Sequence, residues 1–251
     1  MKVAIYNDTG HRPHFGCKLV MDAYRELLAV RDIELIGNPD KADLVLVNGE
    51  GCIHHDQSID LLALAKTYPC ILMNCVFQDI SPAHSHLLQN FKHITVRESM
   101  SAEYMESHGY TPEIVPDLIF SHTLPQFRGK RKKSIFFSDR EPDASISTGF
   151  YTQSPDEPQF IEKMSAYERA CCGRFHAICV AAMLNMPFSA WSSNTWKNEA
   201  IMADMGIPDL YADSQRAALI RIPDECSDSV ARYVTEAKIK INALFDRISE
   251  L

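Results

Sequence analysis

The residues best suited to chemistry in this chain lie in the segment Gly173-Arg174-Phe175-His176-Ala177 and at Lys197, which follows His176 by 21 positions. Arg174 and His176 stand just before an apolar run that begins at Ala177. Arginine and lysine bind anions, and an imidazole takes up and releases protons near neutral pH. These residue types indicate a site for an anionic substrate, with His176 as the candidate general acid or base.

The elements around this segment are expected to present it at a helix start. The apolar run predicts a buried helix, and an arginine at its N-terminal end is unfavourable because of the helix dipole. Packing alone therefore explains Arg174 poorly. Farther along, Ser193 and Asn194 are expected to cap the next helix and offer its first N–H groups to an anion, with Lys197 one turn inside.

Arg97 is a second candidate cation, because it follows a predicted strand over residues 93–96 and precedes a predicted helix. One interpretation is structural, with Ser99 as the helix cap and Arg97 in a surface ion pair. The other is functional, with the guanidinium clamping a carboxylate or phosphate through two hydrogen bonds. The residues alone leave both open.

A loop with glycines and histidines follows the buried strand predicted over residues 44–47. Gly49 and Gly51 would allow a ligand to approach the backbone closely, and His54 and His55 could transfer protons. The alternative is a tight turn with solvated histidines. A zinc site would need further ligands that the sequence does not identify, so no metal is predicted.

Composition limits the class of protein. Hydrophobic residues make up 46% and charged residues 23% of the 251 residues, which is typical of a globular chain. The formal net charge of −8 argues against a general nucleic-acid binder, because such proteins carry excess cations. The basic run over residues 128–133 is interpreted as a solvated loop, with a phosphate or membrane patch as the alternative.

The chain lacks the sequence signals of export or metal binding. No apolar run approaches the length of a membrane span, and residues 1–8 indicate a strand and turn rather than a signal peptide. The eight cysteines contain no Cys-x-x-Cys pair. We therefore expect reduced thiols and a cytoplasmic protein, with no integral membrane segment.

Short apolar runs alternate with amphipathic segments along the chain, which predicts an α/β fold of parallel sheets. We expect an N-terminal Rossmann-like domain over residues 1–122 and a smaller one over 134–224. A C-terminal helix within 225–251 is expected to brace the two domains. In the second domain the pattern predicts helices over residues 160–167, 175–184 and 194–205, and one short strand near 146–152.

Several segments, in their observed order, resemble the polysaccharide pyruvyl transferase family. No single motif is decisive, but the ordered set covers nearly the whole chain. The set comprises Phe15-Gly16-Cys17, Asn48-Gly49-Glu50-Gly51, Thr95-Val96-Arg97-Glu98-Ser99-x-Ser101, Val115-Pro116-Asp117, Gly173-Arg174-Phe175-His176-Ala177, and Pro187-Phe188-Ser189-Ala190 followed by Ser193-Asn194-x-x-Lys197.

This resemblance implies a GT-B-like fold with the active site in the cleft between two Rossmann-like domains. Characterised members transfer a pyruvyl group from phosphoenolpyruvate to two hydroxyls of a sugar and form a ketal. Carried over by motif, the site residues are Arg97, His176 and Lys197, with His54 or His55 as a weaker fourth. The resemblance implies a carbohydrate acceptor, phosphoenolpyruvate as donor co-substrate and no further cofactor.

The chain also departs from the family pattern. Its loop has Glu50 between two glycines where many members have three glycines, and Glu98 stands where an aspartate is common. The second domain is short, so the identity of the acceptor does not transfer. Two alternatives stay open: a glycosyltransferase that uses a nucleotide sugar, and a non-catalytic relative that binds a glycan or a partner protein.

Overall fold

A computed structural model describes residues 1–12, 14–50, 53–124, 132–138 and 157–251. The chain forms two compact units, each made of segments that are separated in the sequence. The first unit contains residues 1–10, 20–118 and 239–251, and the second contains residues 11–19 and 119–238. Each unit is built around its own parallel sheet.

The sheet of the first unit has the strand order β2-β1-β3-β4-β5-β6, and every neighbouring pair is parallel. Every residue of β3 and β4 is buried, as expected for central strands that are covered on both faces. The chain order reverses between β1 and β3, and such switch points are where open α/β sheets bind ligands. The strands are β1 (Lys2–Tyr6), β2 (Glu34–Ile36), β3 (Leu44–Asn48), β4 (Cys70–Cys75), β5 (His93–Val96) and β6 (Glu113–Ile114).

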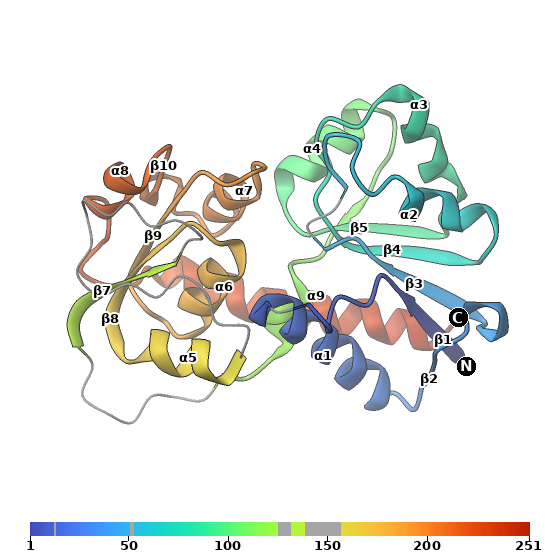
Figure 1. The fold of residues 1–251 in the computed structure, drawn as a ribbon, viewed down its shortest axis with the longest axis horizontal. Coiled ribbons are helices and arrows are strands. Elements are labelled where there is room, and N and C mark those ends of the chain that lie inside the picture. Colours follow the sequence, from blue (N-terminus) through green and yellow to red (C-terminus); the bar gives the residue numbers. More distant parts are fainter. Residues whose placement is uncertain (13, 51–52, 125–131, 139–156) are drawn as a thin grey trace. The chain divides into compact units, whose positions relative to one another are not determined.

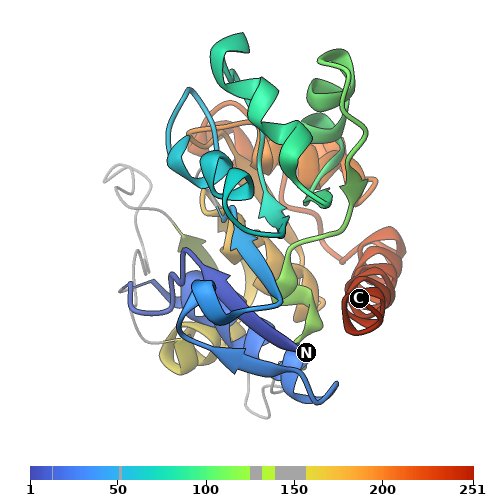
Figure 2. The same cartoon turned by 90° about the vertical axis from the view of Figure 1, so that its right-hand side faces the viewer.

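Helices cover both faces of this sheet. Figures 1 and 2 show α2 (Asp60–Ala63), α3 (Pro82–Ser85) and α4 (Ser99–Ser107) together on one face. On α1 (Phe15–Ala29), the Tyr24 ring packs edge-on against Phe245, with ring centroids 6.1 Å apart. The unit therefore depends on a helix segment that lies far away in the sequence.

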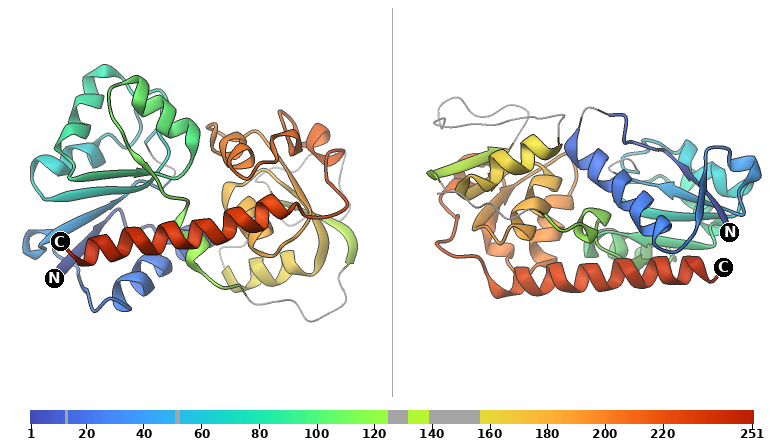
Figure 3. Two further views of the ribbon diagram at one scale, coloured as in Figure 1. Left: turned by 180° about the vertical axis from the view of Figure 1, so that it is seen from behind. Right: turned by 90° about the horizontal axis from the view of Figure 1, so that it is seen from below.

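The long helix α9 (Asp228–Ser249) supplies that segment. Figure 3 shows it as a single uninterrupted helix, and its buried stripe agrees with the predicted amphipathic pattern. Its residues up to 238 belong to the second unit, and those from 239 belong to the first. The stripe consists of Val230, Ala237, Ile241, Leu244, Phe245 and Ile248.

The sheet of the second unit is also parallel, in the order β10-β9-β8-β7. Alternation along β7 sends neighbouring side chains to opposite faces. Phe136 contacts Phe160 of α5 at a centroid distance of 5.5 Å, whereas Phe137 packs in a cluster with Ala218 of α8. The elements are β7 (Lys132–Ser138), α5 (Glu157–Ser165), β8 (Tyr167–Cys172), α6 (Phe175–Met183), β9 (Phe188–Trp191), α7 (Lys197–Asp204), β10 (Tyr211–Ala212) and α8 (Gln215–Leu219).

Short turns of 3₁₀-helix complete the two units. They are η1 (Pro39–Lys41), η2 (Leu64–Lys66), η3 (His86–Asn90), η4 (Leu118–Ser121) and η5 (Pro208–Leu210). Two of them, η2 and η3, directly follow the short helices α2 and α3.

The two parallel sheets confirm the predicted α/β class. The main error concerns β8, because the sequence analysis predicted no strand there and extended a helix to residue 167. The strand opens with Tyr167, Glu168 and Arg169, which are only half-buried, so no apolar run marks it. The strand predicted near residues 146–152 and the basic run up to residue 131 lie outside the described residues. The last two residues of that run, 132 and 133, belong to β7, so the loop predicted there is wrong.

Candidate functional site

The candidate residues of the second unit lie at the carboxyl ends of two neighbouring strands. β8 and β9 are parallel and in register, with Cys172 opposite Ala190. The loop after β8 carries Arg174 and leads to His176 in the first turn of α6, and the loop after β9 leads to Lys197. Both loops therefore leave the same edge of the sheet, which is where parallel sheets carry their ligand sites.

Asn198 ties these two loops together, and the sequence analysis did not identify it. Its buried side-chain amide donates hydrogen bonds to the carbonyl oxygens of Gly173 (3.1 Å) and Trp191 (2.9 Å). Gly173 is required for this approach, because a Cβ there would lie 2.4 Å from the Trp191 indole. These hydrogen bonds fix Gly173, which directly precedes Arg174, against the start of α7.

His176 lies in the first turn of α6 and is only 7% exposed. The backbone of Gly16, in the first turn of α1, touches its ring. A Cβ on Gly16 would lie 1.9 Å from Nδ1 of His176, so only glycine fits this position without moving the imidazole. The predicted motif around Gly16 thus meets the predicted motif around His176 within the second unit.

Arg174 occupies the N-cap position of α6, with φ −106° and ψ 130°. Its side chain makes no capping hydrogen bond, because a guanidinium has only donors. This placement confirms the predicted position of a cation at the mouth of an apolar helix, all of whose residues from 175 to 182 are buried.

The predicted capping by Ser193 and Asn194 is wrong. Helix α7 begins at Lys197 with Trp196 as N-cap, so Lys197 is the first helical residue and not one turn inside. The side-chain oxygen of Asn194 instead accepts hydrogen bonds from Ser193 Oγ and from Lys197 Nζ. A turn over residues 194–196 therefore separates these side chains from the helix start.

Three buried polar atoms near this edge have no hydrogen-bond partner within the described ranges. They are Ser138 Oγ, Thr195 Oγ1 and Asn198 Oδ1. Ser138 ends β7, and its carbonyl oxygen accepts the N–H of Gly173 at 2.8 Å. Buried polar atoms without partners are costly, and they are commonly found where a ligand or water completes the site.

In the first unit, Arg97 is almost completely buried, with 2% of its side chain exposed. Its Nη1 donates to Asp117 Oδ2 at 2.8 Å, and Asp117 is fully buried. The surface ion pair considered for Arg97 is therefore wrong. The helix cap considered for Ser99 is also wrong, because Glu98 is the N-cap of α4 and accepts from Ser101 N at 2.9 Å.

Tyr24 lies within the same buried region. Burial raises the pKa of Tyr24 well above its ordinary value, and electrostatic interactions with Cys75, Asp117 and Glu50 raise this pKa further. Its hydroxyl has no hydrogen-bond partner in the part of the chain that the structure describes. The Tyr24 phenol is therefore neutral. The carboxylates of Glu50 and Asp117, which belong to two of the predicted motifs, lie near its hydroxyl.

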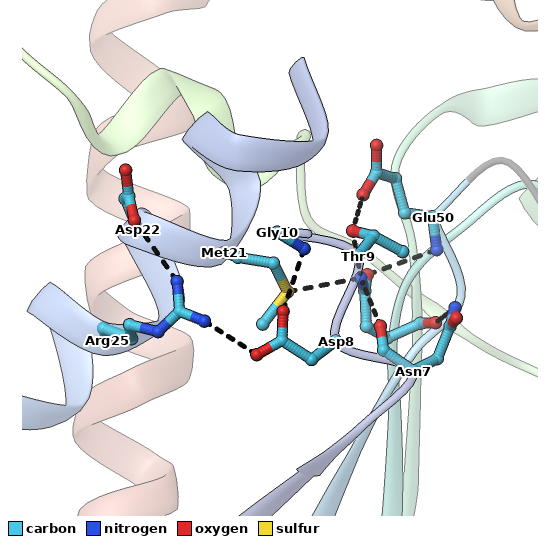
Figure 4. Close-up of polar contacts among 9 residues, drawn as sticks. Asn7, Asp8, Thr9, Gly10, Met21, Asp22, Arg25 and Glu50 are labelled. Atoms are coloured by element: carbon cyan, nitrogen blue, oxygen red, sulfur yellow. Dashed lines mark hydrogen bonds and ion pairs between the residues drawn. The ribbon is translucent and has the colours of Figure 1, made fainter. Parts of the chain in front are cut away.

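The loops at the switch point hold a network of polar side chains (Figure 4). Asn7 and Asn48 each donate a side-chain hydrogen bond to the other's backbone carbonyl, at 2.6 Å and 3.2 Å. Thr9 Oγ1 donates to the buried carboxylate of Glu50 at 2.6 Å. The loop residue that departs from the family pattern is thus held firmly beside the end of β1.

The glycines and histidines of this loop have different environments. A Cβ on Gly49 would lie 2.0 Å from Cys75 Sγ, so Gly49 allows the loop to pass close to β4. Gly51 lies outside the described residues. His54 is buried, whereas His55 is exposed and its Nδ1 lies 3.0 Å from a carboxylate oxygen of Asp79. Among the described residues, no group of three or more potential ligands is placed to hold a metal ion.

None of the helices in the described ranges combines the length and apolar character that crossing a membrane requires. A search of curated proteins found no match. Among solved structures, an uncharacterized protein from Klebsiella pneumoniae has a similar fold, with a TM-score of 0.57 and 15% sequence identity. The match covers 90% of this chain and 91% of that chain, and at this identity it supports the fold alone.

Residues 4–192 match the sequence model of the polysaccharide pyruvyl transferase family. The match includes the loops after β1, β3 and β5, and the β8 loop with His176. It spans most of the chain and includes strands of both parallel sheets, although β10 lies beyond it. The chain therefore belongs to the polysaccharide pyruvyl transferase family.

Proposed function

We propose that this protein transfers the pyruvyl group of phosphoenolpyruvate to two hydroxyls of a carbohydrate and so forms a ketal. Family membership supports a transferase of polysaccharide biosynthesis. We further propose that phosphoenolpyruvate is the donor and that the architecture is GT-B-like. The roles given below to single residues are proposed as well.

The observation that carries the proposal is the edge of the second sheet. Two loops that leave neighbouring strands bring a nearly buried histidine, an arginine at a helix N-cap and a lysine at a helix start to one edge. Phosphoenolpyruvate has a carboxylate and a phosphate, and both groups suit arginine and lysine. The buried polar atoms without described partners at the same edge support a ligand there.

The proposed reaction conserves its atoms and protons. The methylene carbon of phosphoenolpyruvate takes up a proton, which His176 supplies as general acid, and the neighbouring carbon becomes electrophilic. One sugar hydroxyl adds to that carbon and releases its proton, and the bond to the bridging oxygen breaks so that inorganic phosphate leaves. A second hydroxyl then adds and releases its proton. One released proton restores His176, and the other leaves with phosphate.

Arg97 enters the proposal as a further substrate-binding cation, because its motif matches the family. Its guanidinium already pairs with Asp117, so its replacement affects folding as well as binding. For this reason the decisive variants are those of the second unit. Arg174 and Lys197 are half-buried, and their replacement is expected to leave the fold intact.

The test is a reaction with phosphoenolpyruvate and a panel of candidate glycans, followed by mass spectrometry of the glycan and an assay for released phosphate. We expect equal amounts of ketal and phosphate. His176→Gln should lower the rate by about 100-fold or more, as loss of a general acid does, with an unchanged melting temperature.

Thermal-shift measurements without acceptor provide the control. Stabilisation by phosphoenolpyruvate and not by nucleotide sugars is the expected result, and it should be lost in Arg174→Ala. Stabilisation by nucleotide sugars alone would contradict the proposal and favour a glycosyltransferase. Full activity of His176→Gln would contradict the role given to that residue.

A further inference from the structure

His14, which the sequence analysis did not identify, begins helix α1 as its N-cap residue. Its Nδ1 accepts hydrogen bonds from the backbone N–H groups of Gly16 (3.1 Å) and Cys17 (3.4 Å). Its carbonyl accepts from Lys18 N at 3.2 Å, which is the first regular bond of the helix. Side chains of Ser, Thr, Asp and Asn usually make this contact. Here an imidazole makes it instead.

This contact fixes the chemical state of the ring. Nδ1 can accept two N–H groups only if it keeps its lone pair, so the proton of the neutral ring is on Nε2. A second proton on Nδ1 would break both capping bonds and place a cation at the positive end of the helix dipole. His14 is therefore held as a neutral imidazole whose Nε2–H is a hydrogen-bond donor.

The ring of His14 lies beside that of His176. Their centroids are 5.7 Å apart, with planes tilted by 59°. Phe15 stacks on His14 at 5.2 Å and on Phe160 of α5 at 3.7 Å, which anchors the start of α1. With the Gly16 backbone against the His176 ring, three successive residues pack around this site. All of them belong to the second unit.

We propose that His14 is a second histidine of the substrate site, and that its Nε2–H donates a hydrogen bond to an anionic oxygen of the donor substrate. This inference rests on the proposed function. His176 moves the proton, whereas His14 binds the oxygen through Nε2 and keeps the lone pair of Nδ1 for the two N–H groups of α1. The pair divides two tasks that one imidazole cannot perform together, because a proton carrier changes its hydrogen-bonding pattern during the reaction.

The test compares His14→Asn with His14→Ala. Asparagine is a good N-cap residue and keeps the helix start, but it removes the Nε2–H donor. We expect His14→Asn to keep the wild-type melting temperature and to bind phosphoenolpyruvate about tenfold more weakly, which is the effect of one hydrogen bond to a charged group. His14→Ala should show the same loss of affinity together with a lower melting temperature.

Nitrogen NMR of ¹⁵N-histidine-labelled protein gives a readout that is independent of turnover. We expect His14 to show a neutral ring protonated at Nε2, and its Nε2 signal to move when phosphoenolpyruvate is added. A proton on Nδ1 of His14, or wild-type affinity in His14→Asn, would overturn the inference and leave the proposed function standing. If phosphoenolpyruvate perturbs neither His14 nor His176 in the wild type, the proposed function fails as well.

Discussion

Arg97 and Arg174 both follow parallel strands, and both belong to segments that match the family, but their surroundings differ. Arg97 is 2% exposed and its charge is balanced by the buried carboxylate of Asp117. Arg174 is half-buried and stands at a helix N-cap, where the helix dipole gives its charge no support. Position after a strand therefore does not tell whether an arginine is neutralised by a buried carboxylate, as Arg97 is, or stands at a helix N-cap, as Arg174 does.

The largest expected effect comes from breaking the buried pair. Asp117→Ala should lower the free energy of unfolding by about 3–5 kcal/mol, because it leaves a buried guanidinium without its carboxylate. Urea denaturation measures this. The matched control is Arg25→Ala, which removes one partner of the exposed Arg25–Asp8 pair and should cost less than about 1 kcal/mol.

The double variant Arg97→Leu with Asp117→Leu sharpens this test, because replacing both charges avoids the uncompensated one. It should be more stable than Asp117→Ala. If Asp117→Ala costs no more than Arg25→Ala, the contrast between the two arginines is wrong.

An intermediate effect is expected from Gly16→Ala in the second unit. The new Cβ would overlap the His176 ring, so the ring must move. Overpacking of this kind costs about 1–3 kcal/mol, and a displaced acid should lower the transfer rate by about 100-fold.

Gly37→Ala is the control for this variant, because nothing lies within 4 Å of a Cβ at that position. It should leave both stability and rate close to those of the wild type. A Gly16→Ala protein that resembles Gly37→Ala in both measurements would show that the His176 ring is not held by this contact.

The smallest effect concerns a property that the two units share. Burial raises the pKa of Cys70 in the first unit and of Cys171 in the second to about 11. Because the thiolate is the reactive form, iodoacetamide at pH 8 should leave both residues unmodified in the folded protein and should label both in urea. Peptide mass spectrometry measures the labelling, and modification of either residue before unfolding would contradict the burial.

These shifts also predict how stability depends on pH. The folded state holds the thiol protons more tightly than the unfolded state, whose thiols have a pKa near the reference value of 9.0. The unfolding free energy should therefore decrease as the pH rises from 9 towards 11. Urea denaturation at pH 8 and pH 10 measures this decrease.

Much of the fold could be predicted from the sequence because strong local signals mark it. The buried strand β3 is a continuous apolar run, and Gly109 ends α4 with a φ of +84°, as a glycine after a helix often does. In contrast, β8 begins with Tyr167, Glu168 and Arg169, which are only half-buried, so no local apolar pattern distinguishes this strand from a helix or a loop.

The site was predictable to a smaller extent. Histidine and arginine at the start of an apolar run identified His176 and Arg174. The burial of Arg97 depends on Asp117, which lies 20 positions away and is joined to it only by the fold. His14 and Asn198 could not be predicted from the sequence. His14 caps α1 and Asn198 hydrogen-bonds the carbonyl oxygens of Gly173 and Trp191, and neither residue type indicates its partners by itself.

The division of α9 between the units has a consequence for how the protein is made. The first unit buries Ile241, Leu244, Phe245 and Ile248, but the ribosome adds these residues only after it has made the whole second unit. The apolar surface that they cover stays exposed during that interval, and such surfaces favour aggregation. The strands of the first sheet are therefore synthesised before most of the second unit, but the core of the first unit can be completed only after the second unit has been synthesised.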